Sequence, residues 1–212
     1  MTRQRLNRVR IIDTAIQMAD EDGLSSVTLR RIAARLGVHV TSLYNHVPTK
    51  EAVLDEMIAR LVAEADLPTG AIAWEAWVRQ FAAAMRDVAR KHPGAFGAFH
   101  HGPVQGPQAA LVFEAALASF RSGGFDVASA YCAVKATAVA VLGAVLEDMV
   151  PSRSRGRRTD LSGLPPEPFP HLQEANVIAA EADSFSYLID ALVEGFAATL
   201  RKTQSGASPR DR

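Results

Sequence analysis

The stretch LRRIAARLGVHVTSLYNHV, residues 29–47, decides the fold of this chain. It predicts two short helices joined by a tight turn at Gly37, with small Ala33 where the two helices would cross. Leu43 falls on the inward face of the second helix. This is the spacing of a helix-turn-helix, whose second helix enters the major groove of DNA. An ordinary corner between two core helices has the same spacing, so the pattern alone leaves both interpretations open.

Helical periodicity continues along the rest of the chain. Apolar residues recur three and four positions apart, alanine is abundant, and aromatic or β-branched runs with period two are scarce. These features predict an all-α protein, with an N-terminal three-helix helix-turn-helix domain and a larger helical domain after it. We expect helices over residues 7–19, 29–36, 40–47, 50–65, 74–90, 107–121, 126–149 and 175–200, and a loop over 151–171.

The composition of the chain limits the classes of function that the protein can have. The chain has 212 residues, 48% of them apolar, which suffices for a sizeable core. A single cysteine, Cys132, excludes a disulfide within the chain and suits a cytoplasmic protein. No apolar segment follows the basic N-terminus, and the most apolar run, 136–146, is too short to span a bilayer, so we expect no membrane insertion. Residues 1–50 carry eight basic and four acidic groups, which favours a polyanion-binding N-terminal part.

The segment IIDTAIQMADEDGLSSVTLRRIAARLGVHVTSLYNHVPTKEAVLDEM, residues 11–57, resembles the DNA-binding head of the tetracycline-repressor (TetR) family. Its most specific part is LGVHVTSLYNHV, followed by Lys50 and Leu54-Asp55. The resemblance continues through SGGFDVASAY and VLGAVLEDM, which are similar to the tetracycline-repressor branch. It implies a homodimeric repressor that binds a palindromic double-stranded DNA operator and is released by a small-molecule ligand.

The resemblance also implies a division of the chain. Residues 1–50 form the DNA-binding domain, 51–66 a connecting helix, 67–203 the ligand-binding and dimerisation domain, and 204–212 a disordered tail. The helices over 126–149 and 175–200 are then expected to pair with their copies in the partner subunit as a four-helix bundle.

Carried over position by position, the resemblance implies specific DNA contacts. Arg30 matches the base-reading arginine, which can bind guanine bidentately. The recognition helix and the start of the next helix supply the other contacts, namely Val40, Thr41, Ser42, Tyr44, Asn45, His46 and Lys50. Leu29 stands where tetracycline repressors have threonine and Val40 where they have glutamine, which implies a different operator. Instead of contacting DNA, Tyr44 could pack against the first helix. His46 and Lys50 could instead be ordinary solvent-exposed surface residues.

In such a protein the second domain binds a small molecule, and the resemblance places the walls of the binding pocket on the central helices. The expected ligand-binding residues are Trp77, Phe81, Met85, Phe99, His100, Phe113, Leu117, Leu142 and Leu146. Such a pocket would prefer a largely apolar, ring-containing compound. An aromatic stripe at helical spacing is more often part of a plain core than of a pocket.

A metal ion is the one cofactor that the resemblance implies. His100 and Glu147 match positions that help to hold a Mg²⁺ ion which arrives with the drug in tetracycline repressors. The alternatives are a histidine at a helix end and a glutamate paired at an interface. Phe81 stands where an asparagine belongs and Ala65-Asp66 where a histidine belongs, so we do not expect a tetracycline sensor.

Two other function classes are compatible with a helical protein of this kind. A DNA-binding dimer without a small-molecule inducer has the same motifs. An enzyme built on a helical bundle is disfavoured, because the sequence has no nucleophile elbow, no Glu-x-x-His pair, no phosphate-binding glycine loop and no His/Cys cluster. We therefore expect no catalytic residues.

Overall fold

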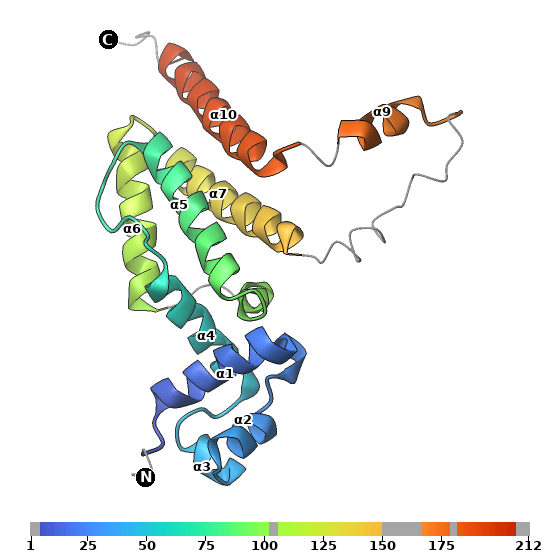
Figure 1. The fold of residues 1–212 in the computed structure, drawn as a ribbon. Helices are drawn as coiled ribbons and strands as arrows, with labels where there is room; N and C mark the ends of the chain where they lie inside the picture. Colours follow the sequence, from blue (N-terminus) through green and yellow to red (C-terminus); the bar gives the residue numbers. More distant parts are fainter. Residues whose placement is uncertain (1–4, 102–105, 150–166, 179–181, 207–212) are drawn as a thin grey trace. The chain divides into compact units, whose positions relative to one another are not determined.

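The computed structural model describes residues 5–101, 106–149, 167–178 and 182–206, and these residues form helices joined by turns (Figure 1). No strand occurs among them, which confirms the all-α prediction. The chain divides into two compact units, residues 1–142 and 143–212. The first unit contains the helix-turn-helix and the aromatic core.

Three short helices open the chain. They are α1 (Arg8–Asp22), α2 (Leu29–Leu36) and α3 (Val40–Tyr44). Side-chain caps begin the first two: the Asn7 side chain accepts a hydrogen bond from the N–H of residue 10, and the Thr28 side chain accepts one from the N–H of residue 31. Gly37 ends α2 with φ +67°, a left-handed conformation that favours glycine. Ile11, Ile32 and Leu43 are fully buried and hold the three helices together.

The fourth helix, α4 (Lys50–Glu64), follows Pro48 and is capped by Thr49. Its buried residues, including Met57 and Leu61, pack on α1 at one side. Farther along, α4 contacts the 3₁₀ helix η2 (Ala95–His100) and α6 (Pro107–Ser122). One continuous helix therefore runs from the helix-turn-helix into the rest of the first unit.

An aromatic cluster forms the core beyond α4. Trp74 and Trp77 lie on α5 (Trp74–Lys91), and both are buried against Phe120 of α6. Phe125 completes the cluster, with its ring centroid 5.4 Å from that of Trp74 and 5.2 Å from that of Phe120. Such edge-on pairs fix the relative orientation of the helices that carry them.

The helix α7 (Val127–Asp148) has 22 residues, twice the length of the apolar run noted in the sequence. By length and composition it could cross a membrane, which the apolar run alone did not suggest. One such helix is weak evidence of a membrane protein, because core helices of soluble proteins pass the same test.

The second unit differs from the expected helix over 175–200. It contains α9 (Pro170–Ile178) and α10 (Ser184–Gly206), so the expectation of one helix is wrong. The Asp183 carboxylate explains the start of α10, because it accepts hydrogen bonds from the Ser186 N–H and hydroxyl at 3.0 and 2.7 Å. Residues 204–206 of the expected tail continue α10. Residues 207–212, and 151–166 of the expected loop, lie outside the described residues.

Candidate functional site

The recognition helix α3 is anchored by its inner side and exposed on its outer side. Leu43 and Val47 are fully buried, whereas Thr41, Tyr44 and Asn45 are exposed. Tyr44 has 53% of its surface accessible to solvent, so packing against α1 does not occupy the whole ring. Val40, Ser42 and His46 are half-buried. The predicted DNA-contacting residues of α3 thus include its whole exposed face.

Arg30 differs from its basic neighbours on α2. The Arg31 guanidinium lies 2.6 Å from the Asp22 carboxylate, and Arg35 pairs with Glu21 at 2.5 Å. Both carboxylates belong to the end of α1 and neutralise their partners. Arg30 is exposed and has no ion-pair partner in the described part of the chain. Its guanidinium is therefore available to an external anion or base.

The N-terminus of α4 favours negative charge. The Thr49 hydroxyl accepts a hydrogen bond from the Ala52 N–H at 3.1 Å. A backbone hydrogen bond, a hydrogen bond to Thr49 and the nearby Lys50 ammonium hold the pKa of Glu51 below its ordinary value. A helix N-terminus stabilises anions through its free N–H groups and its dipole. The same location next to Lys50 suits a phosphate of the DNA backbone.

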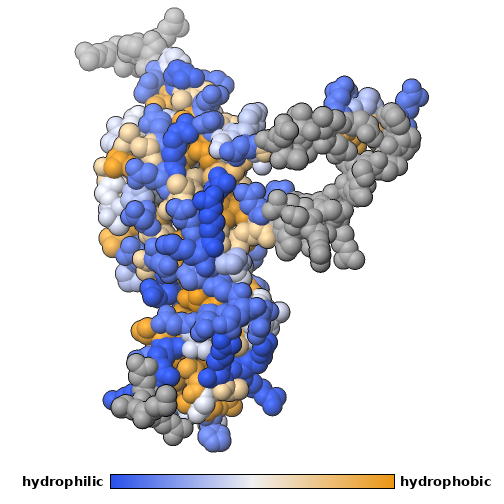
Figure 2. All heavy atoms as spheres, viewed as in Figure 1, coloured by the Kyte–Doolittle hydropathy of each residue, from blue (hydrophilic) through white to orange (hydrophobic). Residues whose placement is uncertain are grey.

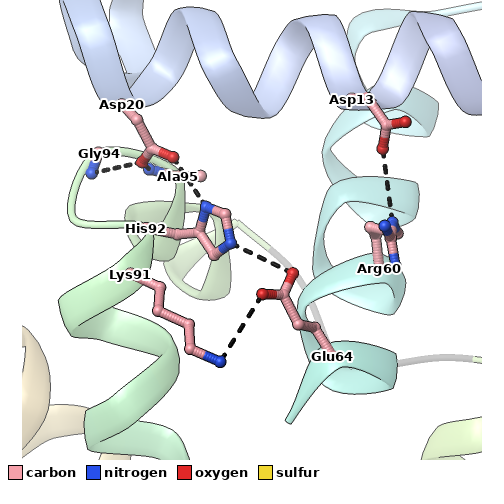
Figure 3. A network of polar contacts seen from close by, with 8 residues as sticks. All are labelled: Asp13, Asp20, Arg60, Glu64, Lys91, His92, Gly94 and Ala95. Atoms are coloured by element: carbon pink, nitrogen blue, oxygen red, sulfur yellow. Dashed lines mark hydrogen bonds and ion pairs between the residues drawn. The ribbon is translucent and has the colours of Figure 1, made fainter.

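A polar junction connects α1 to α5 and η2, as Figure 3 shows. One oxygen of Asp20 accepts hydrogen bonds from the Gly94 and Ala95 N–H groups, both at 2.9 Å. Its other oxygen lies 2.8 Å from His92 Nδ1, and His92 Nε2 lies 3.2 Å from a Glu64 carboxylate oxygen. The junction therefore joins α1, the end of α4 and the end of α5.

Gly94 allows the close approach at this junction. A Cβ atom added at residue 94 would overlap the Ala19 carbonyl group of α1. The turn after α5 can therefore rest directly on the backbone of α1 only because residue 94 has no side chain. No sequence pattern predicted this junction.

A cavity of about 680 Å³ lies among α4, α5, η2, α6 and α7 within the first unit. A volume of that size is typical of sites for drug-sized ligands. The cavity brings together six of the predicted ligand-binding residues, Trp77, Phe81, Met85, Phe99, Phe113 and Leu142. It does not include His100 or Leu117, and Leu146 belongs to the second unit.

One face of α7 supplies a wall that sequence reasoning missed. Its members recur at intervals of three and four residues: Tyr131, Val134, Lys135, Ala138, Val139 and, as predicted, Leu142. The helix is apolar on most sides, so periodicity did not distinguish this face from the others. Val62 and Leu67 close the cavity on the side of α4, together with small residues of α6.

Two polar groups of the cavity wall lack partners. Trp77 is 1% exposed, and its Nε1–H has no hydrogen-bond acceptor within the described residues. A buried donor left unsatisfied is uncommon and costs about 1–3 kcal/mol. The Lys135 ammonium has neither an ion pair nor a hydrogen bond in the same part of the chain. Both groups are hydrogen-bond donors.

The residues around the cavity do not fit a resident metal ion. None of the described lining residues is a His, Asp or Glu. His100 is exposed and outside the lining, and Glu147 belongs to the second unit. Across the described ranges, no group of three or more His, Cys, Asp or Glu side chains could hold a metal. Because His100 and Glu147 belong to different units, their part in holding a Mg²⁺ ion carried by a ligand stays a prediction.

Comparisons with known proteins concern both the helix-turn-helix and the part of the chain that holds the cavity. Residues 11–57 match the family model "Bacterial regulatory proteins, tetR family", and residues 67–200 match "Tetracyclin repressor-like, C-terminal domain". The chain is 33% identical to an HTH-type transcriptional regulator of Saccharopolyspora erythraea over 70% of its own length and 64% of that relative. It is 28% identical to the class D tetracycline repressor protein of Escherichia coli, over 91% and 89% of the two chains.

Solved structures show the same fold. ActR from Streptomyces coelicolor in complex with actinorhodin superimposes with a TM-score of 0.79 at 23% identity. The match covers 92% of this chain and 99% of that one. The N-terminal helix-turn-helix and the helical body are therefore a known arrangement.

Proposed function

The chain belongs to the TetR family of bacterial regulatory proteins, and on that premise we propose that it is a homodimeric repressor released from its operator by a hydrophobic, ring-containing ligand. Its relatives are named transcriptional regulators and repressors, which supports a DNA-binding role and not an enzymatic one. As a DNA-binding protein it would act in the cytoplasm. We assign DNA binding to residues 1–50, ligand binding and dimerisation to 67–203, and their connection to 51–66.

The observation that carries this proposal is the course of α4. The helix begins at Lys50, beside the recognition helix, and its last turns supply Val62 to the cavity wall. A ligand that displaces Val62 therefore acts on the same rigid element that supports the helix-turn-helix. Such a ligand shifts the protein away from its DNA-binding state only if it binds the other state more tightly.

The cavity supports a ligand of defined character. Its wall is mainly apolar and aromatic, with the Trp77 and Phe81 rings stacked at a centroid distance of 5.1 Å. ActR, which shares the fold, binds actinorhodin. These points favour a ligand-responsive repressor over a DNA-binding dimer without an inducer.

Exposed apolar residues support the dimer. Val127 of α7, which is not part of the cavity wall, exposes 66% of its surface, and Tyr187 of α10 exposes 77%. Most of the face shown in Figure 2 is polar, with apolar patches between the charged residues. A second copy of the chain, packed through α7 and α10, would cover apolar residues of this kind. Two heads related by a twofold axis then match a palindrome with half-sites about 34–36 Å apart.

Three measurements test this proposal. Selection from random duplex DNA should recover a palindrome, and sedimentation should give about twice the 22.8 kDa mass of one chain. The protein–operator complex should then dissociate when ring compounds are added. Recovery of an operator together with no release by any compound of a broad library would favour the dimer without an inducer.

A further inference from the structure

The cavity is unusual in its charge. Among its described lining residues, Lys135 is the one charged side chain. Its neighbours one turn away on α7 are Tyr131, Cys132, Ala138 and Val139, so no carboxylate of the helix itself lies within reach at that spacing. By contrast, Arg8, Arg31 and Arg35 in the N-terminal part of the unit each have a carboxylate partner. Lys135 is exposed, so the cavity has a solvent-accessible positive charge on its α7 wall, without a carboxylate partner among the described residues.

The unused polar groups of the wall share one property. Lys135 offers three N–H donors and no acceptor, and the Trp77 indole offers one N–H donor and no acceptor. Trp77 Nε1 is buried out of reach of a ligand atom, whereas Lys135 is exposed and has no partner in the part of the chain that the structure describes. A complementary ligand is therefore rich in acceptors. An anion meets this requirement best, because hydrogen bonds between charged partners are about twice as strong as neutral ones.

The aromatic residues next to Lys135 define the remainder of the ligand. The Phe113 and Tyr131 rings meet edge to face at a centroid distance of 5.9 Å, which places Phe113 of α6 one turn of α7 from Lys135. Trp77 and Phe81 provide a second, stacked pair. A flat aromatic body suits these surfaces, with its acidic group toward Lys135.

Resting on the ligand response proposed above, we infer that the natural ligand is an anionic aromatic compound, such as an aromatic carboxylate or an acidic phenol, whose charged group binds the Lys135 ammonium. Lys135 is then the residue that selects acids over neutral compounds of the same shape.

The test compares matched pairs of probes on the full-length protein. Naphthalene, anthracene and anthraquinone carboxylates are each titrated beside the corresponding carboxamide, and the quenching of tryptophan fluorescence reports binding. Wild type should bind the acids about tenfold more tightly than the amides, a difference of about 1.4 kcal/mol. Lys135→Met should lose this preference and bind the amides as wild type does. Lys135→Arg should retain it.

The outcomes separate this inference from the proposed function. If amides and acids bind wild type equally and both release the operator, the ligand response stands and the inference is overturned. A preference for acids that persists in Lys135→Met overturns the inference as well. If no acid and no amide binds, this inference is overturned, while the ligand response is judged by release of the operator with the broad library. Unchanged amide affinity and far-UV circular dichroism show that a variant is folded.

Discussion

Replacement of Asp20 is the sharpest test of the junction between α1 and the turn after α5. In Asp20→Ala, the Gly94 and Ala95 N–H groups lose their common acceptor and His92 loses a carboxylate partner. A hydrogen bond to a charged group contributes about 1.5–3 kcal/mol. The Asp20 and His92 side chains are about a fifth exposed, so water compensates part of the loss. We expect the free energy of unfolding to fall by about 2–4 kcal/mol, less than the sum of the three bonds.

Asp20→Asn separates the contribution of the two backbone hydrogen bonds from that of the contact with His92. Both backbone N–H groups bond to the same Asp20 oxygen, Oδ1, and an asparagine carbonyl can replace it. The NH2 group of asparagine takes the place of Oδ2, so the charged contact with His92 is lost and we expect a cost of about 1 kcal/mol. For a chain of this length, 1 kcal/mol shifts the melting temperature by about 2–4 °C. Asp20→Ala should therefore melt about 5–15 °C below wild type, and Asp20→Asn about 2–4 °C below.

The assay is thermal and urea unfolding followed by circular dichroism at one protein concentration, because the proposed dimer would make stability concentration-dependent. Asp13→Ala is the matched control on the same helix. Its ion pair with Arg60 at 3.4 Å is half exposed on both sides, and such pairs contribute about 0–1 kcal/mol. Equal losses in Asp20→Ala and Asp20→Asn would refute the reasoning, because the backbone hydrogen bonds would then contribute nothing. A loss in Asp20→Ala no larger than in the control would refute it too.

Four further predictions concern the DNA interface and the helix ends. Arg30→Ala should relax the preference at one base of each half-site by about 1–3 kcal/mol, and an unchanged selected operator would remove Arg30 from the base-reading set. Lys50→Ala should weaken binding to all sequences alike and lower the slope of log affinity against log salt by about one, whereas an unaltered slope would show that Lys50 touches no phosphate. Gly94→Ala should destabilise the protein by about 1–3 kcal/mol, because the new methyl group meets the Ala19 carbonyl; wild-type stability would show that the turn can move away. Hydrogen bonds to the Ser129 backbone and hydroxyl lower the pKa of Asp126 from its ordinary value of 3.8. The stabilisation of α7 by the Asp126 carboxylate should therefore be complete above pH 3.8 and be lost as the pH falls through the lowered pKa. The melting temperatures of wild type and Asp126→Ala should then converge in acid, and a difference that persists in acid would contradict this prediction.

The helices were largely predictable because their signals are local. Thr28 and Gly37 directly flank α2, through a side-chain cap and a left-handed glycine. The expected end of the next helix at residue 47 is wrong, because α3 already ends at Tyr44, three residues earlier. The second unit was less predictable, since alanine and glutamate around residues 179–182 are good helix formers and show no break. Asp183, followed three residues later by Ser186, was the available signal for the start of α10.

The residues of the candidate sites were also predictable only in part. The aromatic residues Trp77, Phe81 and Phe113 stand out at helical spacing, and they line the cavity. Lys135 does not, because a lone lysine on a mostly apolar helix has no sequence signature that separates a cavity wall from solvent. The contact of Asp20 with His92 joins residues 72 positions apart, and no local pattern encodes it. The position of Lys135 at the cavity and the contact of Asp20 with His92 both arise from tertiary packing alone.

The cavity also bears on how long each molecule survives in the cell. If the ligand response proposed above holds, a ligand that binds the cavity of about 680 Å³ in the folded protein makes the occupied protein the more stable form. A ligand at a hundred times its Kd would add about 2.7 kcal/mol of stability. Cellular proteases act on the unfolded fraction, so the compound that removes the repressor from DNA would also protect it from degradation. Intact repressor would then accumulate during induction and restore repression promptly once the compound is gone.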